Sequence, residues 1–218
     1  MRMEHMLTLF DGVRIDHFRA LDSYWSVEAG AKTAQFGKWE KGPGRKLIDA
    51  LSDLTIGALM IAEDLGEITE EVHALVNYSG FLSMRVLQFG FLDERDSFHK
   101  PHHYRERCVV YTGTHDNNTL LGYVWELSEE RRRELLGYCG FSGADWNQSY
   151  DSILQTMLRS HAGLVIFPIQ DLLGFGSDTR MNTPGTTEGN WQFRLTKEQL
   201  DGIDRQKLKD LNRLFSRL

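Results

Sequence analysis

The sequence is poor in cysteine and has no long apolar run. Its two cysteines, Cys108 and Cys139, form no CxxC pair, which argues against a disulfide framework and indicates a reducing compartment. The first residues, "MRMEHMLTLFDG", lack the apolar stretch of a signal peptide. No segment approaches the length of a membrane-spanning helix. We therefore expect a cytoplasmic protein with no membrane partner.

Basic side chains are fewer than acidic ones. Acidic side chains number 31 against 25 basic ones, which gives a net charge of −6. Proteins that bind nucleic acids usually carry a basic patch or stripe. The basic run at 131–133 lies between Glu130 and Glu134, which is typical of a solvated helix face. We therefore expect no nucleic-acid partner.

Histidines are present, but without a metal-binding spacing. Four histidines and an aspartate from two nearby segments suggest a divalent-metal hydrolase, because imidazole and carboxylate groups are metal ligands. These residues are His99, His102, His103, His115 and Asp116. Residues 97–107 contain no HExxH motif, and their proline indicates an irregular loop. We therefore expect no metal and no other cofactor; metal analysis with a chelator control would test the alternative.

The chain does contain enough residues for a substantial core, with 218 residues of which 41% are hydrophobic. Residues 29–46 are Gly-rich and polar, so they are expected to form a long surface loop. Apolar runs predict strands, some followed by their loops, at residues 10–15, 57–66, 84–91, 108–119 and 164–174. Helical spacing predicts helices at residues 46–54, 68–80 (capped by Thr69), 127–140 and 149–163, and one or two helices at 196–218.

Strands that alternate with helices predict βα units and a parallel sheet. In such folds functional residues gather at the carboxyl ends of the strands. Asp16 follows "FDGVRI", Glu63 follows "LMIA", and the pair His115 and Asp116 follows "VVYTGT". One or more βα units fit between successive carboxylates, so the three could converge at one barrel face.

Converging carboxylates suit glycoside chemistry. In a retaining enzyme a nucleophile and a general acid lie about 5 Å apart, and a third carboxylate can favour the oxocarbenium-like transition state. A single Asp or Glu after a strand is more often a helix cap or a surface group. Residues 116–119 could be no more than a helix start. Spacing alone therefore leaves the function open.

Eight motifs, in order, closely resemble those of the 4-α-glucanotransferases, the amylomaltase or disproportionating-enzyme family. They are "VRIDHFRAL", "KTAQFGKWEKGPG", "IAEDLGEIT", "VLQFGF", "YTGTHDNNT", "QDLLGFG", "RMNTPG" and "GNWQFR". The likeness extends from about Phe10 to Arg194. It implies a (β/α)8 barrel with inserted loops and helices. It also implies an enzyme that cleaves an α-1,4-glucan, holds the glycosyl part covalently and passes it to another sugar.

The resemblance also implies residue roles. Asp16 in "RIDHFR" matches the nucleophile, Glu63 in "AEDLG" the general acid/base, and Asp116 in "GTHDNN" the third carboxylate, which holds the distorted sugar ring. Arg14 would lie beside the nucleophile and keep it ionised, because a nearby cation lowers a carboxylate pKa.

Glu63 would need a drier or more acidic neighbourhood to stay protonated. His115 and Asn182 would hydrogen-bond sugar hydroxyls. The implied partner is therefore an α-1,4-glucan or malto-oligosaccharide.

The sequence departs from the family in three places. Leu82 and Ser83 stand where relatives usually have Pro-Gly, and "THDNN" stands for "THDND". In the family the "RIDHFR" strand is the fourth of the barrel, and three preceding βα units need on the order of thirty residues each. We therefore expect residues 1–218 to be a carboxyl-terminal portion, about strands four to eight, without the amino-terminal part of the barrel.

Such a portion would leave two apolar sheet edges, at "DGVRI" and "LVIFP", so self-association and impaired activity are expected. Two alternative functions stay open: an α-amylase-type hydrolase, and a non-catalytic glucan-binding fragment. Five aromatic residues could stack on glucose rings, although core packing or loop anchoring is the favoured role of each one taken alone. They are Trp25, Trp39, Phe89, Phe91 and Trp191.

Overall fold

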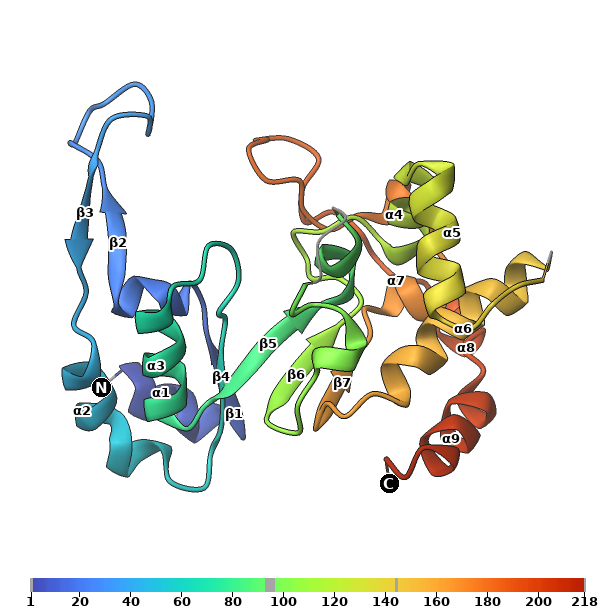
Figure 1. Ribbon diagram of the computed structural model, residues 1–218, viewed down its shortest axis with the longest axis horizontal. Helices are drawn as coiled ribbons and strands as arrows, with labels where there is room; N and C mark the ends of the chain where they lie inside the picture. Colours follow the sequence, from blue (N-terminus) through green and yellow to red (C-terminus); the bar gives the residue numbers. More distant parts are fainter. Residues whose placement is uncertain (1, 93–96, 144, 218) are drawn as a thin grey trace. The chain divides into compact units, whose positions relative to one another are not determined.

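Strands and helices alternate along the chain in the computed structural model, which describes residues 2–92, 97–143 and 145–217 (Figure 1). Five parallel strands follow one another in the sheet in their order along the chain, β1-β4-β5-β6-β7. They are β1 (Gly12–Ile15), β4 (Leu59–Ala62), β5 (Leu82–Val86), β6 (Cys108–Tyr111) and β7 (Leu164–Ile166). Parallel neighbours need crossover connections, so the predicted α/β class is confirmed.

The chain forms two compact units, Met1–Met84 (unit 1) and Arg85–Leu218 (unit 2). The boundary falls inside β5, whose Leu82 and Ser83 pair with β4 in unit 1. The helices of unit 1 are α1 (Arg2–Leu9), α2 (Arg45–Thr55) and α3 (Glu70–Ser79). Eight of its buried apolar side chains form one core: Phe18, Ile48, Met60, Ala62, Val72, Leu75, Val76 and Phe81.

Helix α3 illustrates how the local sequence fixes an element of unit 1. Glu70 and Glu71 lie in its first turn, where the helix dipole favours negative charge. Gly80 ends the helix in the left-handed region (φ 69°) and donates its N–H to the Asn77 carbonyl, an arrangement that glycine adopts without a steric penalty. Thr69 precedes the helix as predicted, but its hydroxyl makes no capping hydrogen bond.

The prediction of a long loop over 29–46 is wrong in two places. Lys38–Lys41 forms β3, which pairs antiparallel with β2 (Ser23–Ser26), and α2 already begins at Arg45. Gly42 permits the close return of the chain, because a Cβ there would lie 2.2 Å from the Ala20 carbonyl oxygen. Pairing between segments, which polar composition does not reveal, therefore makes this hairpin.

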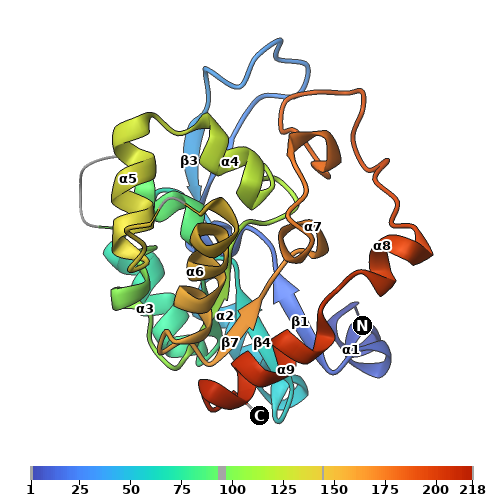
Figure 2. The same cartoon turned by 90° about the vertical axis from the view of Figure 1, so that its right-hand side faces the viewer.

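Unit 2 packs its helices around a second core. Its helices are α4 (Leu120–Glu126), α5 (Glu129–Tyr138), α6 (Trp146–Leu158), α7 (Ile169–Leu172), α8 (Lys197–Asp201) and α9 (Arg205–Leu214). Val110, Leu120, Ile153 and Met157 are fully buried at its centre, and α6 contacts α9 (Figure 2). The expected helices at 127–140 and 149–163 are confirmed, and the expected segment at 196–218 contains two helices, α8 and α9, the second of which ends at Leu214. Leu218 lies outside the described residues.

Two strand predictions in unit 2 extend too far. The strand expected at 84–91 ends at Val86, and 87–91 forms a 3-10 turn. The strand expected at 164–174 ends at Ile166, and α7 begins directly after Pro168. Proline has no N–H for a sheet ladder and suits the start of a helix. Helix α1 in unit 1 was not anticipated by the sequence pattern.

The two strands at the ends of the sheet order are β1 and β7, the two strands expected to form edges. All of their residues are only half-buried, whereas Met60, Ile61 and Ala62 of β4 are buried. Within the described parts of the chain, no helix is long and apolar enough to cross a membrane.

Candidate active site

The register of two strands brings Asp16 and Glu63 to the same end of the sheet. Arg14 pairs with Ile61 and Ile15 with Ala62, so the next residue along each strand is a carboxylate. The backbone continues this pairing, because the Glu63 N–H donates to the Ile15 carbonyl at 3.0 Å. The predicted position at carboxyl strand ends is therefore observed for both residues.

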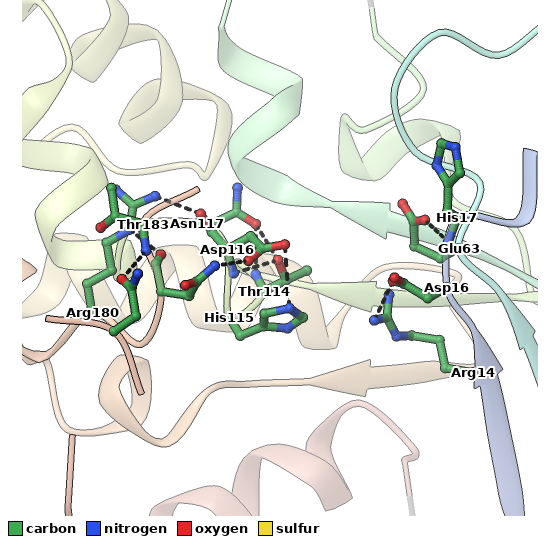
Figure 3. A network of polar contacts seen from close by, with 12 residues as sticks. Arg14, Asp16, His17, Glu63, Thr114, His115, Asp116, Asn117, Arg180 and Thr183 are labelled. Carbon is green, nitrogen blue, oxygen red and sulfur yellow. Dashed lines mark hydrogen bonds and ion pairs between the residues drawn. The ribbon is translucent and has the colours of Figure 1, made fainter. Parts of the chain in front are cut away.

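Arg14 forms an ion pair with Asp16. Its Nη2 lies 2.8 Å from Asp16 Oδ1, and the Asp16 side chain is 77% exposed (Figure 3). The two residues are separated by one position, which places both side chains on one face at the end of β1. Asp16 is thus accessible to a ligand from solvent, while its charge has a fixed cationic neighbour.

Glu63 has a different environment. Its Oε2 accepts a hydrogen bond from the His17 backbone N–H at 2.6 Å (Figure 3). Burial is the largest effect and raises the pKa of Glu63 above its usual value. The negative charge of Asp16 raises this pKa further, whereas the hydrogen bond from His17 and the positive charge of Arg14 lower it. Burial and a neighbouring negative charge therefore both favour the protonated form of Glu63, and its role as general acid/base stays a prediction.

His17 itself occupies an uncommon backbone conformation. Its φ of 47° and ψ of 49° lie in the left-handed region. Non-glycine residues rarely adopt this conformation, and those that do are often found at functional sites. This conformation aims the His17 N–H at Glu63. The Phe18 N–H then donates to the Glu63 carbonyl at 3.0 Å. Two backbone N–H groups of the loop after β1 are therefore hydrogen-bonded to Glu63, the residue that follows β4.

In unit 2 a turn fixes the loop between β6 and α4. The Asn117 side-chain oxygen accepts hydrogen bonds from the N–H and hydroxyl of Thr114, at 2.9 and 2.8 Å. Helix α4 begins only at Leu120, and its cap is the Thr119 hydroxyl. Asp116 therefore lies in the loop, before the helix start that was the alternative interpretation of residues 116–119.

The structure brings His115, Asp116 and Asn182 together. Asn182 Nδ2 donates to Asp116 Oδ1 at 2.6 Å, and the Asn182 N–H donates to the His115 carbonyl at 3.0 Å. His115 Nε2 lies 3.4 Å from Asp116 Oδ2. Arg180 adds two further bonds, from Nη2 to the Asp116 carbonyl and from Nε to the Asn182 carbonyl. Of the predicted site residues, His115, Asp116 and Asn182 belong to unit 2. The other three, Arg14, Asp16 and Glu63, belong to unit 1.

Asp171 is a buried residue that the sequence analysis did not assign. Only 1% of it is exposed. Its carboxylate accepts hydrogen bonds from the Thr112 hydroxyl at 2.5 Å and the Leu120 N–H at 2.8 Å. Burial raises the pKa of Asp171 to about 6, while the two hydrogen bonds act in the opposite direction. Asp171 thereby ties together both ends of the loop that carries Asp116.

The signal for Asp171 was present in the sequence. It lies in "QDLLGFG", a motif quoted for the family resemblance, and a carboxylate inside an apolar run requires a polar partner. Arg180 also lies in a motif of the resemblance, "RMNTPG", but the sequence does not indicate its bonds, because they are to backbone carbonyls.

The candidate stacking aromatics differ in their surroundings. Phe91 is fully buried in the core of unit 2, which confirms core packing, the role favoured for it, and excludes stacking on a sugar. Phe89 packs edge-on against His99. Trp191 lies 5.3 Å from the His115 ring and has a positive φ of 62°. Trp25 and Trp39 are both exposed.

The histidines of residues 97–107 form hydrogen bonds with other residues of unit 2. His102 Nδ1 lies 2.9 Å from the Tyr138 hydroxyl, and His99 Nδ1 accepts from the Val86 N–H. Burial lowers the pKa of His99 to about 4. Among residues 2–92, 97–143 and 145–217 no group of three or more His, Cys, Asp or Glu residues is placed to hold a metal ion. The expected absence of a metal stays a prediction.

Comparison with known proteins identifies related sequences over the whole chain. A family model described as 4-alpha-glucanotransferase, of glycoside hydrolase family 77, matches residues 1–200. A 4-alpha-glucanotransferase from Synechocystis is 42% identical over 99% of this chain and 43% of its own length. A chloroplastic/amyloplastic 4-alpha-glucanotransferase from Arabidopsis thaliana is 40% identical over 100% of this chain and 38% of its own length.

A solved structure also resembles the chain closely. The amylomaltase from Streptococcus agalactiae in complex with acarbose matches 99% of this chain and 43% of its own, with a TM-score of 0.91 and 33% sequence identity. This likeness confirms the predicted fold class of a partial (β/α)8 barrel. The chain spans less than half the length of each of these relatives.

Proposed function

This chain belongs to the 4-alpha-glucanotransferase family, and we propose that it carries the catalytic carboxylates of an enzyme that moves segments of an α-1,4-glucan to a new sugar acceptor. One contrast carries the proposal: Asp16 is exposed beside Arg14, whereas burial raises the pKa of Glu63. A retaining double displacement needs one carboxylate as nucleophile and another that retains its proton. Because the chain spans less than half of its relatives, the activity is proposed for the complete enzyme.

In the first step Glu63 donates its proton to the glycosidic oxygen while Asp16 attacks the anomeric carbon. The bond from that carbon to the leaving oxygen breaks, and a covalent bond to the Asp16 carboxylate forms. The shortened glucan leaves with the proton. The hydrogen bond from the His17 N–H, at 2.6 Å, holds the Glu63 carboxyl in a fixed orientation for this transfer.

In the second step the ionised Glu63 removes a proton from the 4-hydroxyl of an acceptor sugar. The acceptor oxygen attacks the anomeric carbon, displaces Asp16, and restores the original configuration. No cofactor takes part in either step. Transfer prevails over hydrolysis only when the site excludes water while the intermediate persists.

Asp116 is proposed to stabilise the positive charge of the oxocarbenium-like transition state. The family resemblance assigns this role, and the hydrogen bonds from Asn182 and Arg180 support it because they fix the loop and the carboxylate orientation. His115 and Asn182 are proposed to hydrogen-bond sugar hydroxyls. The proposed substrate is an α-1,4-glucan or malto-oligosaccharide.

The experiment is a maltotriose assay that measures both product lengths and reducing ends. Transfer produces glucose and longer malto-oligosaccharides without a net gain in reducing ends. A gain in reducing ends would instead favour an α-amylase-type hydrolase. Binding without any turnover, by the complete enzyme, would favour a non-catalytic glucan-binding protein.

We further propose that residues 1–218 alone have impaired activity and self-associate through the edges of β1 and β7, because unpaired strand edges are sites of association. Light scattering beside the maltotriose assay tests this. A monomer with full transfer activity would contradict it. A cytoplasmic location also stays a prediction, because the plant relative is named chloroplastic/amyloplastic.

A further inference from the structure

The hairpin of β2 and β3 in unit 1 (Figure 1) carries two tryptophans at paired positions. Trp25 and Trp39, the aromatic pair, are directly opposite each other in the register, so their side chains share one face of the ribbon. Their rings are 5.5 Å apart and inclined by 68°. Trp25 is 40% and Trp39 53% exposed. The hairpin therefore presents a substantial aromatic surface to solvent.

Several contacts hold this aromatic surface rigid. The Trp25 indole N–H donates to the Ala34 carbonyl at 2.8 Å. The Arg19 guanidinium lies over the Trp39 ring, 4.4 Å from its centroid. Gly37 packs so closely that a Cβ there would lie 2.7 Å from the Trp25 ring. A ligand that binds preordered rings loses less conformational entropy than one that must order them.

The aromatic pair is not needed for the core of unit 1. Neither tryptophan belongs to the buried cluster around Phe18. Arg19 is 8% exposed, and its buried Nε has no hydrogen-bond partner, which is unfavourable for stability. A rigid exposed surface that is kept in place against stability is typical of a functional site.

We propose that the aromatic pair is a binding surface for α-1,4-linked glucan chains, an inference that rests on the proposed function because that function supplies the ligand class. The faces of a glucopyranose ring carry C–H groups, which pack on aromatic rings, and tryptophan offers a large and rigid contact area. The edges of the sugar carry hydroxyls, and the exposed Lys41 forms an ion pair at 3.2 Å with the partly buried Asp22 at the base of the hairpin.

The inclination of the two rings favours an α-linked ligand. An α-1,4-glucan bends from one glucose to the next, so consecutive rings can rest on two surfaces that are not coplanar. A β-1,4-glucan is a flat ribbon and requires a coplanar platform. With rings inclined by 68°, the aromatic pair is expected to bind malto-oligosaccharides in preference to cello-oligosaccharides.

The surface is connected to the candidate nucleophile by a short stretch of chain. Arg19, which covers one face of Trp39, lies three residues after Asp16. The 3-10 helix Phe18–Leu21 joins the two, and β2 begins at Ser23. A glucan held by the aromatic pair is therefore held by the same loop of unit 1 that carries Asp16.

The test is a titration of the 218-residue chain with maltoheptaose. An Asp16→Asn background prevents consumption of the ligand, and calorimetry gives the affinity. Trp39→Ala is expected to weaken maltoheptaose binding about tenfold or more. Trp39→Phe is expected to have an affinity between those of the parent and Trp39→Ala. The control is Trp125→Ala in unit 2, because Trp125 is also exposed (61%) and also has an arginine, Arg132, over its ring. This control is expected to bind as the parent does.

The position of binding is read from the indole N–H signals of the tryptophans by NMR. The signals of Trp25 and Trp39 are expected to shift with maltoheptaose and to stay in place with cellohexaose. Circular dichroism melting curves identify any variant that is unfolded. If Trp39→Ala is unfolded, the proposal is judged from the NMR shifts of the Trp25 and Trp39 indole signals in the parent protein. Three results would overturn the proposal: no binding, equal affinity of parent and Trp39→Ala, or shifts confined to Trp191. Because the readout is binding, a failure here is distinguishable from a failure of transfer in the maltotriose assay.

Discussion

Replacing Asp171 with asparagine tests how the loop that carries Asp116 is held. Burial raises the pKa of Asp171 to about 6 from the usual 3.8. A carboxyl whose pKa is raised on folding contributes stability that is fully present below the unfolded pKa, and that stability is lost as the pH rises through the folded pKa. The shift of about 2 units corresponds to about 3 kcal/mol of unfolding free energy lost between about pH 4 and pH 6.

Asparagine has nearly the same shape and cannot ionise. Its oxygen can accept from the Leu120 N–H and its NH2 can donate to the Thr112 hydroxyl, so both partners of Asp171 remain satisfied. We therefore expect Asp171→Asn to match the wild type near pH 4 and to exceed its stability by up to about 3 kcal/mol near pH 7.5.

The assay is urea unfolding of wild type and variant at a series of pH values, followed by circular dichroism. Thr112→Val provides a check on the cause, because it removes one of the two hydrogen bonds that lower the pKa of Asp171. The pKa of Asp171 should then rise, so the loss of unfolding free energy should extend to higher pH in Thr112→Val than in the wild type. A stability difference between Asp171→Asn and wild type that stays constant from pH 4 to pH 7.5 would refute this reasoning.

Three further substitutions have expected outcomes. Asp16→Asn should abolish transfer in an active form of the enzyme while its melting curve stays unchanged, since the side chain is exposed; near-normal transfer would count against the nucleophile. Asn182→Ala should lower the transfer rate about tenfold to a hundredfold, because Asp116 loses a charge-assisted hydrogen bond; an unchanged rate would contradict this. Gly122→Ala should destabilise unit 2 by about 1–3 kcal/mol in urea unfolding, because its Cβ would lie 2.3 Å from a neighbouring side chain. Gly137→Ala, with nothing within 4 Å, is its control and should be neutral or stabilising.

The parts of the fold that sequence reasoning predicted depend on local pattern. Apolar runs gave the positions of the strands, and the residue after β1 and after β4 is a carboxylate, as expected. Thr69 lies at the start of α3, as expected, although its hydroxyl makes no capping hydrogen bond. Each of these features is encoded within a few neighbouring residues, so a single sequence is sufficient to reveal it.

The features that were missed depend on contacts between distant residues. Strand β3 exists because it pairs with β2, although its sequence is polar. Asp171 is important because it bonds Thr112 and Leu120, which lie 59 and 51 residues away. Local periodicity carries no information on such pairs. The motif of Asp171 indicates that a carboxylate in an apolar run needs a polar partner, but only the packing shows that the partners are Thr112 and Leu120.

The most direct test of the central claim is to trap the covalent intermediate. Glu63→Gln, in an enzymatically active form of the protein that includes residues 1–218, removes the proton donor. A donor sugar with an activated leaving group needs no proton in the first step, so glycosyl-enzyme should accumulate. Mass spectrometry of the digested protein is then expected to find the sugar on the peptide that contains Asp16. A sugar on another residue, or no adduct at all when the parent enzyme is active, would contradict the assignment of Asp16 and Glu63.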